Sequence, residues 1–109
     1  MVTPKLIEEI IKAYRRHGWQ LQRVLLRSPT RASIAEAENV IDNGRVQDSE
    51  IDALWFSRAS HEGREAWELR LIAEQQYALF EAFEPDETEE QREEVRQEME
   101  ARMRQHLTL

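Results

Sequence analysis

The sequence contains no cysteine and only three glycines and three prolines. Without cysteine, disulfide bonds, thiolate metal sites and cysteine nucleophiles are excluded, and the composition suits a reducing cytoplasm. Gly18, Gly44 and Gly63 each interrupt a periodic segment, where glycine suits the left-handed turn that ends a helix or closes a hairpin. No glycine is left over for a glycine-rich loop that binds phosphate groups.

Long apolar runs are also missing. The longest runs, such as Ala53-Leu54-Trp55-Phe56, are far too short to cross a bilayer, and the N-terminus lacks the apolar region of a secretory signal. A length of 109 residues suits one domain. We therefore expect a single soluble, cytoplasmic domain that has no membrane association.

Positive charge is scarce relative to negative charge. The chain has 22 acidic and 15 basic side chains, which gives a formal net charge of −7. Residues 84–109 hold 9 of the acidic and only 4 of the basic side chains, so the acidic excess is concentrated near the C-terminus. This balance disfavours nucleic acid as the main partner, because phosphate binding needs a positive surface.

Each proline lies where a helix is predicted to begin, since a proline suits the first helical position. In the first helix, apolar residues such as Ile7, Ile11 and Tyr14 recur at helical spacing. The helices are predicted over residues 3–17, over residues 28–43, and from Pro85 to near the C-terminus.

Four segments are predicted to be strands: residues 19–27, 52–59, 64–72 and 76–83. The first carries apolar residues on both faces, which indicates an interior strand or a strand with a bulge. The last three follow one another through short turns and should pair antiparallel. Residues 45–51 are polar and are predicted to form a loop with at most a short helical turn.

The resulting fold class is α+β, with the order α-β-α-β-β-β-α. We expect a four-stranded, mostly antiparallel sheet with the helices mainly on one face. Residues 1–84 should form a compact core, and a long acidic helix over residues 85–109 should complete the same domain.

Residues for catalysis or metal binding do not form a recognisable pattern. His17, His61 and His106 are not spaced as metal ligands, so no metal site and no cofactor are predicted. There is no Gly-x-Ser-x-Gly nucleophile motif either. We assign no catalytic residue, although the many carboxylates leave a small acid–base enzyme or ligand binder as an alternative.

One basic segment stands out, because no acidic residue occurs between Ile10 and Ala35. Its arginines could bind RNA, phosphate or an acidic partner. The first two could instead complement the negative end of the first helix. The candidate anion-binding residues are Arg15, Arg16, Arg23, Arg27 and Arg31.

Two apolar sets are candidates for an interface. One belongs to the strands and would form the sheet face that the helices leave uncovered. The other is a narrow stripe along the last helix, whose methionines suit an adaptable contact surface. The candidate interface residues are Val24, Leu26, Leu54, Phe56, Phe80, Val95, Met99, Met103 and Leu107.

These patterns favour a non-catalytic protein-interaction or regulatory module, with self-association into a homodimer as one form of that role. An RNA- or anion-binding accessory protein that uses the basic segment is the first alternative. A small acid–base enzyme or ligand binder is the second.

Overall fold

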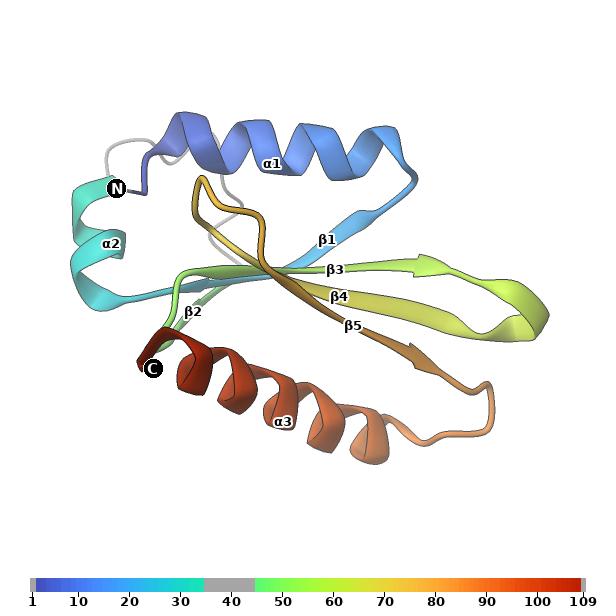
Figure 1. The fold of residues 1–109 in the computed structure, drawn as a ribbon. Coiled ribbons are helices and arrows are strands. Elements are labelled where there is room, and N and C mark those ends of the chain that lie inside the picture. Colours follow the sequence, from blue (N-terminus) through green and yellow to red (C-terminus); the bar gives the residue numbers. More distant parts are fainter. Residues whose placement is uncertain (1, 35–44, 109) are drawn as a thin grey trace.

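The computed structural model describes residues 2–34 and 45–108 and has an α+β fold, as predicted (Figure 1). Most elements begin and end within one or two residues of the bounds predicted from the apolar periodicity. The elements are α1 (Pro4–Arg16), β1 (Gln20–Leu26), α2 (Ser28–Ile34), β2 (Val46–Asp48), β3 (Ala53–Ala59), the 3₁₀ turn η3 (His61–Gly63), β4 (Glu65–Leu71), β5 (Ala78–Phe83) and α3 (Glu89–Thr108).

The sheet has five strands in the order β2-β1-β3-β4-β5, so the prediction of a four-stranded sheet was wrong. The additional strand is β2, which pairs parallel to β1 and makes the sheet mixed. It was predicted as a loop, because its three residues are too few to show an alternating pattern. The β3–β4 and β4–β5 pairings are antiparallel, as predicted, and the β1–β3 pairing is antiparallel as well.

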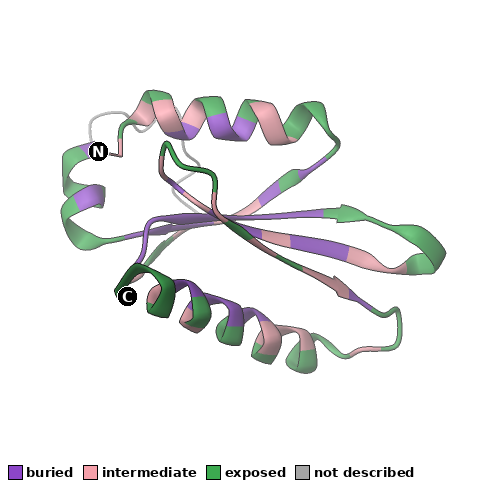
Figure 2. Ribbon diagram, in the orientation of Figure 1, coloured by how far each residue is buried: buried purple, intermediate pink, exposed green. Residues whose placement is uncertain are grey.

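Helices cover both faces of the sheet, which corrects the prediction that they lie mainly on one face. Figure 1 shows α1 on one side of the sheet and α3 on the other, and we call these sides the α1 face and the α3 face. Two separate apolar clusters result, and Figure 2 shows buried residues on the sides of α1 and α3 that face the sheet. The central strands are apolar on both faces because each face is covered by a helix.

The first strand, β1, lies inside the sheet and also contains a bulge. Its register against β3 shifts between Leu21 and Arg23, which face Phe56 and Trp55 respectively. One extra residue, Gln22, therefore separates two side chains that point to opposite faces. Leu21 packs on the α1 face, whereas the following Arg23 points to the α3 face.

Local hydrogen bonds fix the ends of the helices. The Thr3 hydroxyl accepts from the amide of Leu6 at 3.1 Å, and Pro4 occupies the first turn of α1. At α3, Thr88 and Gln91 form the predicted capping box, with reciprocal bonds of 2.9 and 3.1 Å. The helix therefore begins at Glu89, and the prediction that it starts at Pro85 was wrong.

The second helix, α2, is hydrogen-bonded at its start to Asp52, the residue that precedes β3. The carboxylate of Asp52, which lies next to β3, accepts from the amide of Arg27 at 2.8 Å and from the hydroxyl of Thr30 at 2.9 Å. This bond pair ties the start of α2 to the sheet. The predicted continuation of the helix to residue 43 lies outside the described residues.

Candidate protein-interaction surface

Strand β5 forms one edge of the sheet. It pairs with β4 on one side, and no other strand within residues 2–34 and 45–108 pairs with its other side. The opposite edge is formed by β2, which has only three residues and carries an Arg31–Asp48 ion pair at 2.7 Å. Short strands and charges protect an edge from pairing. The β2 edge is protected by its length and its ion pair, whereas β5 is twice as long and carries one charged side chain, Glu81.

The main-chain groups of β5 alternate in direction. The amide of Leu71 donates to the carbonyl of Tyr77 at 2.9 Å, which makes these two residues a hydrogen-bonded pair at the end of the β4–β5 ladder. Because hydrogen-bonded pairs recur at every second residue of an antiparallel ladder, the intervening residues turn their N–H and C=O groups outward. These outward residues are Ala78, Phe80 and Ala82. We call their main-chain groups, together with the Phe80 ring, the β5 edge.

The Phe80 ring lies on the α1 face and is 57% exposed. It meets the buried Trp19 ring edge-to-face, with the ring centroids 6.5 Å apart. Trp19 is held in turn by the guanidinium of Arg58, which lies 4.4 Å above its ring. Phe80 is therefore an exposed aromatic side chain that contacts a buried ring, and its neighbours on the same face of β5 are the small residues Ala78 and Ala82.

Beneath the strand, α3 supports the opposite side of β5. The Phe83 side chain is fully buried in the α3-face cluster, and Leu79 packs against that cluster. Tyr77 stacks on His106 near the end of α3, with the ring centroids 3.7 Å apart. One side of β5 is thus fixed by packing while its outer edge stays open.

Next to Phe80, a tyrosine and a carboxylate join α1 to the sheet. Tyr14 stacks on Phe56 with ring centroids 4.1 Å apart, and its hydroxyl donates to Glu68, which faces Phe80 across the β4–β5 ladder. Burial raises the pKa of Tyr14 well above its usual value, and the hydrogen bond to the Glu68 carboxylate raises it further. Tyr14 therefore stays protonated and acts as a clamp between α1 and β4.

The structure divides the predicted interface residues between the core and the surface. Val24, Leu26, Leu54 and Phe56 are buried under α1. Met99 and Met103 are buried on the α3 face, and Val95 is half-buried beside them. Within the described part of the chain, only Phe80 and Leu107 are large, exposed apolar side chains, with Leu107 48% exposed. Phe80 alone of these two belongs to an open strand edge.

The predicted anion-binding arginines do not form one patch. Arg15 and Arg16 are exposed at the end of α1, whereas Arg27 and Arg31 follow β1, whose seven residues span about 20 Å. Arg31 pairs with Asp48, as described above. A hollow of about 460 Å³ lies at the start of β1 and places Arg15 near Arg45, a residue that was not singled out from the sequence.

Arg23, the remaining residue of that set, takes part in an ion-pair network on the α3 face. Its guanidinium donates to both carboxylate oxygens of Glu93, at 2.7 and 3.2 Å. Glu93 also accepts from Arg96 at 2.9 Å. The hydrogen bonds from Arg23 are the main reason that the pKa of Glu93 falls to about 2. Arg23 thus holds α3 against β1.

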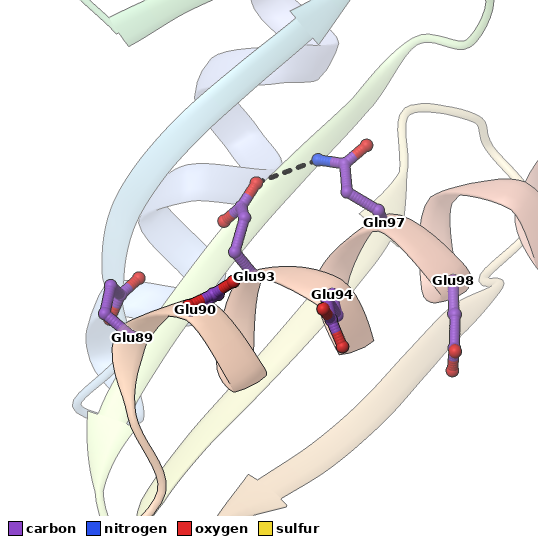
Figure 3. Close-up of a pocket in the computed structure, with 6 residues that line it drawn as sticks. All are labelled: Glu89, Glu90, Glu93, Glu94, Gln97 and Glu98. Carbon is purple, nitrogen blue, oxygen red and sulfur yellow. Dashed lines mark hydrogen bonds between the residues drawn. The ribbon is translucent and has the colours of Figure 1, made fainter.

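A shallow hollow of about 790 Å³ runs along the exposed side of α3 (Figure 3). Glu93 and Gln97 lie next to each other there and share a hydrogen bond of 2.9 Å, while Glu94 and Glu98 point away from them. The lining residues are Glu89, Glu90, Glu93, Glu94, Gln97 and Glu98. Solvated glutamates on a helix surface are ordinary, and no apolar side chain of the described residues lines this hollow.

Neither a metal site nor a membrane span is present in the described part of the chain. No three histidine, aspartate or glutamate side chains within it are grouped to hold a metal ion. None of its helices is long and apolar enough to cross a membrane.

No known protein family matches this sequence, and comparison with curated proteins and with solved structures also finds no match. The functional argument accordingly rests on the geometry of the chain itself.

Proposed function

We propose that this chain is a non-catalytic protein-interaction module that binds an extended segment of a partner at the β5 edge. In this mode a peptide adds a strand to the sheet, and the main-chain hydrogen bonds supply much of its affinity. The observation that carries the proposal is an edge strand of six residues with three outward pairs of main-chain N–H and C=O groups and the exposed Phe80 ring at its centre.

The surroundings of the edge support this role. Outward N–H and C=O groups are bonded to water in the free chain, so an incoming strand replaces these bonds at little enthalpic cost. The Phe80 ring offers an apolar anchor at the centre of the strand, and aromatic anchors commonly dominate binding at interfaces. Because α3 and the Trp19 ring already fix the strand, little conformational entropy remains to be lost on binding.

A peptide-display selection tests the proposal. Random peptides are selected on the immobilised chain, and hydrogen exchange is then measured with a selected peptide bound. The amides of Ala78, Phe80 and Ala82 should exchange more slowly in the complex. The amides of Leu79 and Glu81, which turn toward β4, serve as the internal reference.

The A82P variant tests whether the peptide binds at the β5 edge. It removes one outward N–H group and adds a ring at the open edge, but it leaves the β4–β5 ladder intact. Peptide affinity should fall at least about tenfold, since one lost hydrogen bond contributes about 1 kcal/mol and the ring adds a steric clash. Equal selection on A82P, or protection confined to another surface, would show that the β5 edge is not the binding site.

A further inference from the structure

We infer that the partner strand at the β5 edge is β5 of a second copy of this chain, paired antiparallel with Phe80 on the two-fold axis. This inference rests on the proposed function and adds the identity of the partner and the register. In the resulting dimer the two sheets would join into one continuous sheet.

The outward main-chain groups select this register. In a two-fold antiparallel pair centred on Phe80, this residue faces the partner's Phe80, and Ala78 faces the partner's Ala82. All three outward residues of each strand then meet outward residues of the other, which gives about six inter-chain hydrogen bonds. Centring the pair on Leu79 or on Glu81 leaves one outward residue of each strand without a counterpart within the strand.

The side chains agree with the same register. On the α1 face, the two Phe80 rings meet as a cross-strand aromatic pair with alanines on both sides, an arrangement that stabilises antiparallel pairs. On the α3 face, Leu79 lies opposite the partner's Glu81. A pair centred on Glu81 would instead place two carboxylates directly opposite each other, which destabilises a sheet. Of the three registers, the one centred on Phe80 is the one that pairs every outward residue of β5 and opposes no like charges.

The charge of the chain bears on the strength of the dimer. Each copy carries a net charge of −7, so the two copies repel each other at low ionic strength. An interface formed by one strand edge is also small, and small interfaces are typical of weak complexes. We therefore expect a dimer that forms at high protein concentration and becomes tighter as salt is added.

Single-cysteine variants test the register, because the natural chain has no cysteine. Residues in a hydrogen-bonded antiparallel pair have Cα atoms about 5.5 Å apart, within the range that a disulfide can span. In the Phe80-centred register, a mixture of A78C and A82C should cross-link under mild oxidation. A78C alone or A82C alone should not cross-link. In this register the two copies of the same residue are offset by four positions along the strands, so their Cα atoms lie at least about 13 Å apart.

Sedimentation at several concentrations tests the association itself. The unmodified chain should dimerise, and F80E should shift to monomer because it places two like charges on the two-fold axis. Q47E adds the same charge to an exposed residue of the opposite edge strand and should dimerise as the unmodified chain does. Circular dichroism must show both variants folded, which the exposure of Phe80 and Gln47 favours.

The outcomes separate the inference from the function on which it rests. A dimer that survives F80E, or an A78C variant that cross-links to itself, overturns the inference. So does a chain that stays monomeric at every concentration and salt. If selected peptides still protect the edge amides of that monomer, the proposed function stands with a different partner. If they do not, both ideas fail.

Discussion

Arg96 offers the strongest test of how α3 is held on the sheet. Its side chain is only 1% exposed, and its guanidinium lies 4.0 Å above the Trp67 ring and 5.4 Å from the Phe83 ring. It also donates to Glu89 and Glu93. Among the described residues its Nε finds no acceptor, so the arginine is incompletely hydrogen-bonded. Its packing and its position over the aromatic rings should therefore matter more than its ion pairs.

The cost of R96A follows from these contacts. Two buried methylene groups contribute about 1.6 kcal/mol, and a desolvated cation–π contact contributes about 2 kcal/mol. The ion pairs add little, because Glu89 is 71% exposed and Glu93 keeps Arg23. R96A should thus destabilise the chain by about 3.5 kcal/mol. The R96M variant also loses the cation–π contact of about 2 kcal/mol, but it retains the packed stem and removes the buried, unsatisfied Nε, which offsets about 1 kcal/mol. Its net cost should therefore be about 1 kcal/mol.

Thermal and urea unfolding followed by circular dichroism measure both variants. With about 4 °C per kcal/mol for a chain of this size, R96A should lower Tm by about 14 °C and R96M by about 4 °C. Equal losses for the two variants would mean that the charge, and not the packed stem, holds α3 in place. A loss below about 1 kcal/mol for R96A would refute the assignment of this residue to the core.

Three further predictions concern single side chains. The pKa of Glu93 is lowered in the folded chain, so its contribution to stability is complete above its unfolded pKa of about 4.3 and is lost as the pH falls toward 2. In thermal melts across this pH range, the Tm of E93Q should therefore fall less with acid than that of the unmodified chain. The pKa of Tyr14 is raised, so its contribution is complete below about pH 10 and is lost above it; Y14F should cost about 1 kcal/mol in urea unfolding at neutral pH and remove the last tyrosine ionisation from an absorbance titration. D52A leaves the Arg27 amide and the Thr30 hydroxyl without their acceptor and should cost about 2 kcal/mol by thermal melt, whereas D52N retains one acceptor oxygen and should cost less.

The local parts of the fold could be predicted from the sequence, because they depend on neighbouring residues. The apolar spacing of α1, the alternation in β4 and the capping box at Thr88 are all visible within a few residues. The number of layers could not be predicted in the same way. Trp55 and Phe56 point to opposite faces of β3, so this strand is apolar on both faces. The sequence does not show whether a second helix or another chain covers the second face.

The roles of the arginines depend on contacts between distant residues, which explains why they were not predictable. Arg23 meets Glu93, a residue 70 positions away, and the bulge at Gln22 sets the face to which Arg23 points. Arg96 was overlooked because a charged residue in an acidic helix suggests a solvated position, whereas it is nearly fully buried over Trp67. Phe80 was singled out from the sequence, but its exposure depends on the strand order.

The contrast between the two sheet edges connects the fold with the proposed role. A strand edge that is not protected invites unwanted pairing, and proteins normally shorten it, charge it or cover it. In this chain β2 has only three residues, and its Asp48 pairs with Arg31, whereas β5 has six residues, carries one charge at Glu81 and exposes the Phe80 ring. The packing of Leu79 and Phe83 in the α3-face cluster holds β5 on the sheet, where it pairs with β4. A strand that is fixed on one side and open on the other is suited to bind one partner strand in one register, and the net charge of −7 limits association beyond that pair.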